Sequence, residues 1–428
     1  MSRRKRLFRE IDRLVPDVSC SNTEHSGCTE GLVLYADACL NGELVLTLHV
    51  LLTADDHLDP SMVQFGPKRF ERKRDFQRCF EVLVNFAVEN RPDLLLVGGD
   101  FYDTILPGNP ARAFVTEQFK RLHERGIKIV LVSGHHDTPK SVEQGVSPLA
   151  VHSRSGHAYF LQGPGLVNKK FIIDGTAVNI AGLSLDPSLS PEQDPLSSQK
   201  IEHEGDVNIF LTHYPIEGFH GYFGQETHIP EASIPNGFQL FAAGHLHRHQ
   251  KRTVRGVPVI YPGSTERCSF QEEGEQKGFV WLELSNEGIV GEEFHRTPAR
   301  PMKTLEFQAI REGNLTRQIQ DAVERVSDSE KILRVRISGS VSLEQLSTYK
   351  RSALLDYTSD RFFYTEFDEE RLNLLTQTPL EALSNTTPLQ ELDRTFQSLL
   401  STAKEDQKPI VNEAWKLTAA KLQDQGVA

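Results

Sequence analysis

The stretch Asp93-Leu-Leu-Leu-Val-Gly-Gly-Asp-Phe-Tyr-Asp103 decides the fold of this chain. A short apolar run that ends at glycines is typical of a buried strand. In an open α/β sheet, ligands bind outside the carboxyl ends of the strands. Asp100 stands at such an end, and the two glycines before it allow the backbone to come close to a bound ion.

The same arrangement, an apolar run followed by Asp or His, occurs four more times. The runs cover residues 45–53, 128–132, 207–211 and 238–243, and the polar clusters that follow them are Asp55-Asp-His57, Gly134-His-His-Asp137, His213 and Gly244-His-Leu-His247. We therefore predict that five strand ends bring these side chains to one edge of one sheet.

The side chains in these clusters are suited to binding divalent metal ions. The predicted ligands are Asp55, His57, Asp100, His135, His213, His245 and His247. They are too many for one ion with roughly four to six ligands, but they suit two ions that share a carboxylate. We expect Asp100 to be the shared ligand. Manganese is the predicted metal, with Fe or Zn as alternatives.

Neighbouring residues are predicted to act on a substrate. His136 follows His135 directly and should point elsewhere, so it is free to act as a general acid or to stabilise charge on a phosphate, with Asp137 orienting its ring. Tyr102 and Asp103 are expected to contact the metal ligands or the substrate. Any one of these histidines alone would more often be structural, but the whole ordered set favours a metal site.

The order of the clusters resembles the pattern of calcineurin-like metallophosphoesterases, which is Asp-x-His, Gly-Asp-x-x-Asp, Gly-Asn-His-Asp, a lone His and Gly-His-x-His. A finer resemblance is to the SbcD-type DNA repair exonucleases, the nuclease subunits of SbcCD-like complexes. It rests on 53–58, on 69–103, on Pro235-Asn-Gly-Phe238 and above all on Val259-Ile-Tyr-Pro-Gly-Ser-Thr-Glu-Arg267. It covers 45–300 well and 301–375 loosely.

The resemblance implies a distribution of roles. Asp55, His57, Asp100 and His247 would hold one ion, and Asp100, His135, His213 and His245 would hold the other. His136 would be the catalytic histidine. The family has Asn where this chain has His135, a change that retunes, weakens or disables the second ion site. We expect binding to be retained, because imidazole reaches a metal from the same backbone position.

The charge pattern bears on the substrate. The 428 residues carry a net charge of −12, yet DNA binding needs only a local basic surface. Two basic runs follow the first and the last ligand cluster, and the predicted DNA contacts in them are Lys68, Arg69, Arg72, Lys73, Arg74, Arg248, Lys251 and Arg252. The alternative is that these runs form an ordinary solvated face.

The sequence also predicts the domains. The fold class is α/β: a four-layer αββα metallophosphoesterase sandwich over 44–300, a small α/β cap domain over 301–375 and a helical tail over 376–428. Residues 1–43 are predicted to be a disordered N-terminal extension. The cap should run strand, helix, strand, helix, strand. Within the tail, Thr387-Pro-Leu-Gln390 has the form of a capping box.

Partners and location follow from these segments. The apolar stripes of the two tail helices must pack on something, either on their own chain or, as the resemblance implies, on the coiled coil of an SbcC-like SMC-type ATPase. A homodimer is a further possibility. Five cysteines without a C-x-x-C pair fit a reducing setting, and no run is long enough to cross a membrane. We expect a cytoplasmic, nucleoid-associated protein.

Three functions remain open. The leading one is a two-metal DNA exonuclease or endonuclease in repair or end processing. The second keeps the chemistry but acts on small phosphodiesters or nucleotides. The third is a catalytically impaired subunit that binds DNA ends and has lost the second ion through His135.

Overall fold

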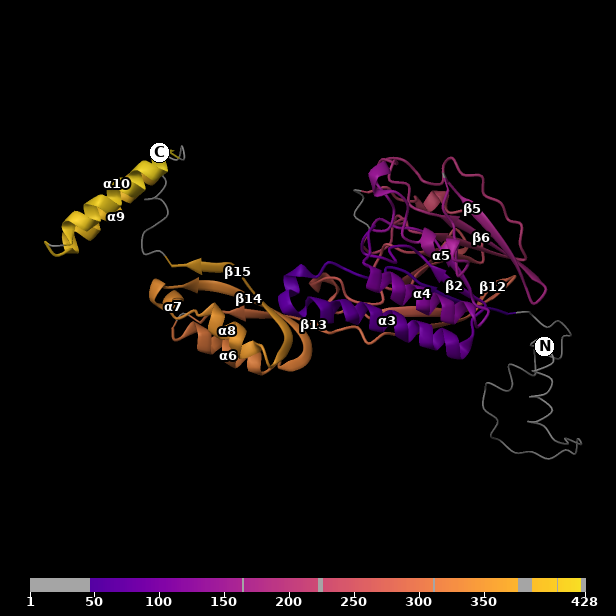
Figure 1. Cartoon of the computed structure of the whole chain (residues 1–428), viewed down its shortest axis with the longest axis horizontal. Helices are drawn as coiled ribbons and strands as arrows, with labels where there is room; N and C mark the ends of the chain where they lie inside the picture. Colours follow the sequence, from indigo (N-terminus) through magenta and orange to yellow (C-terminus); the bar gives the residue numbers. More distant parts are fainter. Residues whose placement is uncertain are drawn as a thin grey trace, which may run out of the picture. The chain divides into compact units, whose positions relative to one another are not determined.

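The computed structural model describes residues 47–163, 165–221, 226–310, 312–375, 387–405 and 407–424 (Figure 1). The predicted N-terminal extension lies outside the described residues. The chain divides into two compact units. The first contains the described residues up to Asp59, then Glu81–Ser264 and Gly278–Arg296; the second contains Pro60–Phe80, Thr265–Lys277 and the described residues from Thr297 onward.

Two six-stranded sheets form the first unit. The first sheet has the order β12-β11-β1-β2-β3-β4 and the second has the order β5-β6-β7-β8-β10-β9. The strands are β1 (Leu48–Thr53), β2 (Leu94–Val97), β3 (Lys128–Leu131), β4 (Tyr159–Phe160), β5 (Val167–Ile173), β6 (Thr176–Leu183), β7 (Val207–Thr212), β8 (Leu240–Ala243), β9 (Gln250–Val254), β10 (Val257–Tyr261), β11 (Gly278–Ser285) and β12 (Gly288–Arg296).

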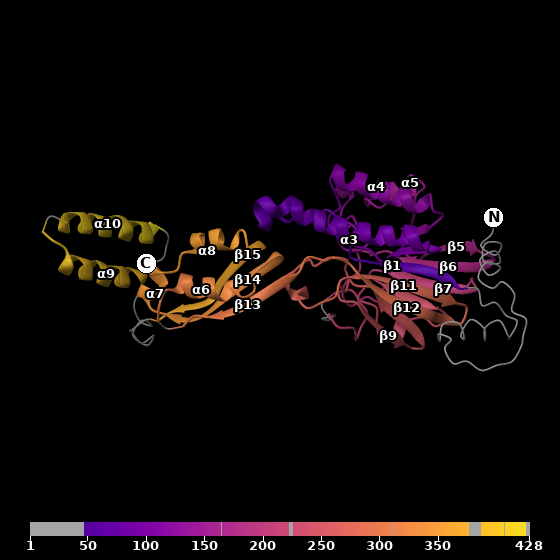
Figure 2. The same ribbon diagram turned by 90° about the horizontal axis from the view of Figure 1, so that it is seen from below.

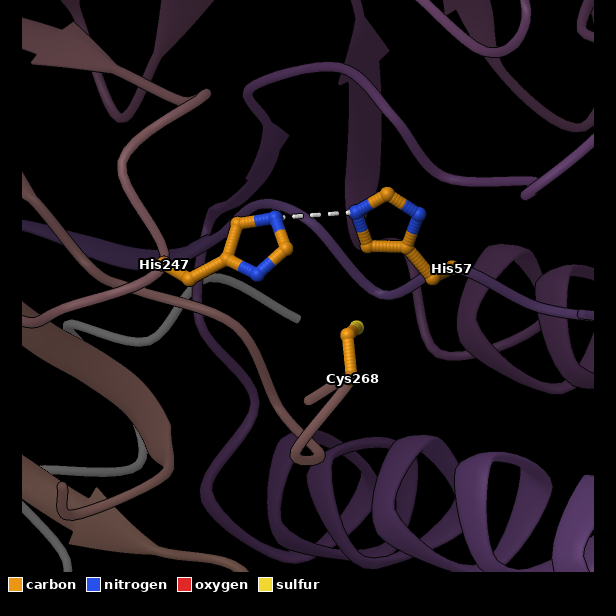
Figure 3. A group of neighbouring side chains, drawn as sticks. All are labelled: His57, His247 and Cys268. Atoms are coloured by element: carbon orange, nitrogen blue, oxygen red, sulfur yellow. Dashed lines mark hydrogen bonds between the residues drawn. The ribbon is translucent and has the colours of Figure 1, made fainter. Parts of the chain in front are cut away.

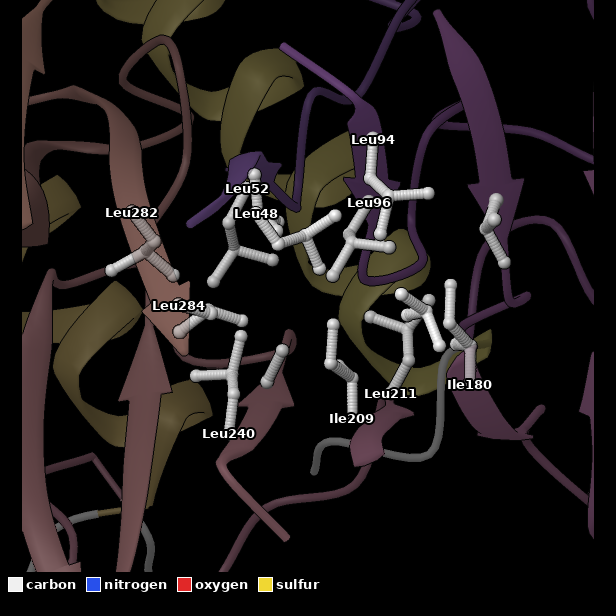
Figure 4. Packing of buried hydrophobic residues seen from close by; sticks show 14 of the residues in the cluster. Leu48, Leu52, Leu94, Leu96, Ile180, Ile209, Leu211, Leu240, Leu282 and Leu284 are labelled. Atoms are coloured by element: carbon white, nitrogen blue, oxygen red, sulfur yellow. The ribbon is translucent and has the colours of Figure 1, made fainter. Parts of the chain in front are cut away.

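An apolar core lies between the two sheets. Figure 4 shows side chains of β1, β2 and β11 facing those of β6, β7 and β8. The central strands β1, β2 and β3 run parallel, as do β6, β7 and β8. These strands are apolar on both faces because each sheet is covered on both sides. The two packed sheets of the predicted sandwich are therefore confirmed.

The outer faces of the sheets are covered differently. Helices α4 (Asn109–His123) and α5 (Ala150–Arg154) pack beside β3 and β4, on the side of the first sheet seen in Figure 2. On the second sheet, an apolar cluster joins the strands to the segments before and after β7. Within the described residues that face carries connecting segments and the short 3-10 helix Glu231–Ser233, where the sequence predicted an α-helical layer.

The second unit contains a three-stranded parallel sheet with the order β13-β14-β15. Its strands and helices are β13 (Met302–Gln308), α6 (Leu315–Glu324), β14 (Asp328–Val341), α7 (Leu343–Ser347), α8 (Arg351–Thr358) and β15 (Phe362–Leu374). The predicted alternation is present, but the second predicted helix is split into α7 and α8. A helical turn ends at Thr348, and the chain leaves helical geometry at Lys350 (φ −121°, ψ 87°) before α8 begins.

A buried ion network explains why the second unit includes segments distant in sequence. Helix α3 (Arg69–Asn90) supplies Arg72 and Asp75, and both are buried. Arg72 lies 2.9 Å from Asp75 and 3.3 Å from Glu266. Arg300 donates from Nε to Asp75 over 2.6 Å, and its backbone N–H donates to Glu266 over 2.9 Å. The two cations and two anions compensate each other, so the boundary between units does not follow the predicted cut at residue 300.

Two helices end the described chain. They are α9 (Pro388–Thr402) and α10 (Lys408–Asp424), and they pack on each other. The predicted capping box is present: the Thr387 side chain accepts from the Gln390 backbone, and the Gln390 side chain accepts from the Thr387 backbone. No helix among the described residues is long and apolar enough to cross a membrane.

The ion network yields a stability prediction. Asp75→Ala leaves two buried guanidinium groups short of a partner and should destabilise the second unit by about 3–5 kcal/mol. Glu330→Gln is the matched control, because Glu330 also pairs with Arg300 but is largely exposed, and its cost should stay within about 0.5 kcal/mol. Calorimetric unfolding of the full chain measures both, and equal stability of the two variants would contradict the role of the network.

Candidate metal centre

The five predicted clusters converge in the first unit, but not on one sheet. The clusters of Asp55, Asp100 and His135 follow β1, β2 and β3 of the first sheet, whereas those of His213 and His245 follow β7 and β8 of the second. The prediction of one edge of one sheet is therefore wrong. The apolar core holds the two sheets face to face, so their carboxyl ends lie next to each other.

His57 and His247 form one side of the centre. Their Nε2 atoms lie 3.1 Å apart. Figure 3 marks this contact with a dashed line. The other ring nitrogen of His57, Nδ1, lies 2.9 Å from a carboxylate oxygen of Asp103. His247 Nε2 lies 3.9 Å from a carboxylate oxygen of Asp55, which is fully buried. These facing nitrogens and the nearby carboxylate can hold a divalent ion.

His213 lies at the middle of the centre. Its Nδ1 hydrogen-bonds to the Gly98 carbonyl over 2.6 Å, and its Nε2 lies 3.1 Å from Asp100 and 3.8 Å from Asp55. Burial favours the neutral forms, but the mutual attraction dominates: the pKa of His213 rises to about 9, and that of Asp100 falls well below its usual value. His57 and His136 lower the pKa of Asp100 further. Asp100 is thus an anion placed among the predicted ligands of both ions.

His135 lies with His213 and His245 in a group whose ligand atoms are within 4.8 Å of one another. Burial, followed by repulsion from the other two histidines, lowers the pKa of His135 to about 3. Its ring is therefore neutral at pH 7 and can offer a lone pair. Among the described residues, its buried Nδ1 atom has no hydrogen-bond partner. A neutral imidazole with an unpartnered buried nitrogen fits a metal ligand.

Backbone geometry aims these side chains. Asp55, His57, Asp100 and His245 all have positive φ angles, of 53°, 43°, 47° and 91°. Such left-handed residues are uncommon and cluster at functional sites. Glycine is needed beside them: a Cβ on Gly134 would overlap the Asp100 carboxylate and the His213 ring. The Gly-Asp and Gly-His motifs therefore have a steric cause.

His136 is held by Asp103 and not by Asp137. The Nδ1 of His136 lies 3.0 Å from the Asp103 carbonyl oxygen and 3.4 Å from its carboxylate. Asp137 is fully buried and accepts hydrogen bonds from the backbone N–H groups of Phe101 and Gly134 over 2.9 and 2.7 Å. The prediction that Asp137 orients the His136 ring is wrong, because its oxygens instead fasten two loops together.

The surface beside His136 is open. A pocket of about 220 Å³ is lined by Asp103, His135, His136, Thr138 and Lys140 among others, so a substrate can reach His136. Lys140 is exposed and was not predicted, because a single lysine in a loop carries no motif. Tyr102, in contrast, is buried and hydrogen-bonds to His152 over 2.8 Å, so it cannot contact a substrate.

The predicted DNA contacts divide into two groups. Arg72 is fully buried in the ion network, so the prediction that it contacts DNA is wrong. The others are at least partly exposed: Lys68, Arg69, Lys73, Arg74, Arg248, Lys251 and Arg252. Lys251 pairs with Glu292 and Arg252 with Glu231, but such surface pairs are worth little and exchange readily.

The residues present fit a divalent metal. Two buried carboxylates stand among five imidazoles whose ring nitrogens lie close together, an arrangement that a cation would compensate. Glu226 also reaches this centre through His245. It was missed in the sequence because it follows no apolar run and belongs to no motif.

Residues 48–249 match the family model described as calcineurin-like phosphoesterase. With the sandwich and the His and Asp clusters, this defines the region as a calcineurin-like metallophosphoesterase domain, a class of hydrolase that uses divalent metals.

Relatives that match longer parts of the chain are more specific. Several of them carry the name DNA double-strand break repair protein Mre11. That of Methanopyrus kandleri is 28% identical over 62% of this chain and 61% of its own length; that of Thermoplasma acidophilum is 28% identical over 64% and 73%. That of Sulfolobus acidocaldarius is 24% identical over 79% and 88%. The chain is thus similar in sequence to these Mre11 proteins, and it spans about three fifths of the length of the first.

Steric crowding at Gly134 predicts the outcome of a substitution. Gly134→Ala should weaken Mn²⁺ binding at least 10-fold, because the added methyl displaces Asp100 or His213. Gly274→Ala is the control, since nothing lies within 4 Å of its added Cβ. Equilibrium dialysis with metal analysis measures both. Undiminished binding by Gly134→Ala would show that the two side chains do not act as ligands.

Proposed function

We propose that this protein is a two-metal phosphodiesterase that cleaves DNA in repair or end processing. The observation that carries the proposal is the gathering of Asp55, Asp100, His135 and His213 with the His57–His247 pair in one centre. The Mre11-type relatives favour DNA over a small phosphodiester.

The proposed centre holds two ions, Mn²⁺ first, with Fe or Zn as alternatives. When bound, such ions act as Lewis acids on the oxygens of the phosphodiester. Asp55, His57, Asp100 and His247 would hold one of them, and Asp100, His135, His213 and His245 the other. The position of His135 beside His213 and His245 supports a retained second ion, and it argues against a subunit that only binds DNA ends.

His136 is the proposed general acid. Its Nδ1 faces the Asp103 carbonyl and carboxylate, which keeps a proton on Nδ1 and orients the ring. The imidazolium form would then give its Nε2 proton to the leaving oxygen and retain the proton on Nδ1. The ring is nearly half exposed (46%), so a substrate can reach it. Asp103 also contacts His57 and so ties the acid to the metal ligands.

The substrate would be held by charge. Lys140 lines the pocket beside His136 and can contact a phosphate. Arg248, Lys251 and Arg252 are exposed on the segment that follows His247. A DNA track held by several cations loses affinity steeply with salt, whereas a mononucleotide does not.

A nuclease assay tests the proposal. We expect Mn²⁺-dependent cleavage of end-labelled linear DNA, and His136→Ala should lower it by about 100-fold or more while leaving metal binding unchanged. His123→Ala, on the exposed side of α4, is the matched control.

If the protein hydrolyses a small phosphodiester but does not cleave DNA, its substrates are small phosphodiesters or nucleotides and the proposal of a DNA nuclease is wrong. Cleavage by His136→Ala at the wild-type rate would contradict the role of this residue.

We also propose that α9 and α10 dock on a coiled-coil ATPase of the SbcC type. The helices pack on each other, and Trp415 donates to Asp393 over 2.6 Å. Leu399, Ile410 and Leu417 nevertheless remain 48%, 70% and 67% exposed. Such a surface marks an interaction site. A homodimer and a nucleoid location belong to the same proposal.

Deletion of residues 385–428 tests the docking. The truncated chain should cleave a small phosphodiester as the full chain does, but it should no longer co-purify with a coiled-coil ATPase that the full chain retains. Leu417→Asp in the full chain should weaken the association in the same direction, and Glu413→Gln, exposed on the same helix, should not. Retention by the truncated chain would place the docking surface elsewhere.

A further inference from the structure

We propose that Glu226 is a positioning residue of the metal centre, which holds His245 through its Nε2 and leaves the Nδ1 of that ring to ligate an ion. The inference rests on the proposed two-metal function and adds to it a residue that orients one of the ligands. Glu226 is not part of any cluster that the sequence predicted.

The contact is direct. A carboxylate oxygen of Glu226 lies 3.1 Å from His245 Nε2, and the two side chains are 34% and 19% exposed. The His245 ring lies beside the rings of His135 and His213, with centroids 4.8 and 5.6 Å away. If the Nε2–H of His245 donates to Glu226, that nitrogen cannot also bind an ion. The nitrogen of the His245 ring that remains for an ion is therefore Nδ1.

The fold brings Glu226 back to the centre. Residue 226 lies in the connection between β7 and β8, and Ile216 and Ile229 form a parallel bridge in it. The Ile229 N–H donates to the Pro215 carbonyl over 2.9 Å, and the Glu217 N–H donates to the Ile229 carbonyl over 3.1 Å. Both isoleucines are fully buried. These contacts fix the part of the connection that follows Glu226 in the core. The path of the chain at this point therefore does not depend on the Glu226 side chain.

Two other predicted ligands show the same arrangement. His57 has Nδ1 against the Asp103 carboxylate and Nε2 toward His247. His213 has Nδ1 against the Gly98 carbonyl and Nε2 toward Asp100. In each case an oxygen holds one nitrogen and the other faces the ligand cluster. A metal-binding histidine ordinarily has such a partner, which fixes its tautomer and raises its basicity. Glu226 completes the pattern at His245.

Electrostatics give a second reason for a carboxylate here. The proposed ligands of the second ion are three imidazoles and the shared Asp100, so only one of these four side chains is a carboxylate. Glu226 interacts electrostatically with His135 and His213 as well as with His245. It therefore adds an anion near the nitrogen-rich half of the centre, and it helps a divalent cation to bind there.

The test compares wild type, Glu226→Ala and Glu226→Gln by calorimetric titration of the metal-free full chain with Mn²⁺. Glu217→Ala is the control, an exposed glutamate in the same connection. Glu226→Ala should raise one of two dissociation constants by about 10- to 100-fold and leave the other unchanged. Glu226→Gln should stay within a few-fold of wild type, because the amide oxygen still accepts from Nε2–H. Unfolding of the metal-free proteins should be the same for all four.

Three results would overturn the inference. Two unchanged dissociation constants in Glu226→Ala would remove Glu226 from the centre but leave the two-metal proposal standing. Equal losses in the Ala and Gln variants would show that Glu226 acts through its charge or by binding the ion directly, and that it does not position His245. Fewer than two ions in the wild type would overturn the two-metal proposal and this inference with it.

Discussion

The packing of two sheets through one apolar core is the constraint on which the centre depends. His57 and His247 are 190 residues apart in the chain, yet their ring nitrogens lie 3.1 Å from each other. They meet because the first sheet carries one ligand set at its strand ends and the second sheet carries the other. A shift between the sheets would separate them, so the leucine and isoleucine core in Figure 4 is as important to the site as the ligands.

Unusual backbone conformations orient the ligands that the packing of the two sheets brings together. Asp55, Asp100 and His245 follow their strands in left-handed conformations, each of which costs of order 1–3 kcal/mol for a residue other than glycine. Hydrogen bonds offset this cost: the His245 N–H donates to both Asp55 oxygens, over 3.1 and 3.0 Å, and the His136 N–H donates to Asp100 over 2.7 Å. Buried carboxylates thus shape the loops as well as the metal centre.

Much of this architecture could be predicted from sequence, and the failures have physical causes. The Asp and His clusters were found because each follows a short apolar run, and the Thr387 cap because its pattern is local. That two sheets share the centre was missed, since strand order is set by long-range pairing. Asp137 and Arg72 were misassigned because burial decides their roles and is not visible in a short motif. Glu226 was missed because it lies in the connection between β7 and β8, and only the folding of that connection brings it to the centre. No periodic pattern in the sequence indicates this position.

The measurement that tests the central claim most directly is electron paramagnetic resonance of the chain loaded with Mn²⁺. The account predicts the spectrum of a spin-coupled pair, because Asp100 lies within reach of both ligand sets and two ions that share it must be close together. A spectrum of isolated Mn²⁺ ions, at one ion per chain or at two, would contradict a shared centre at the junction of the two sheets.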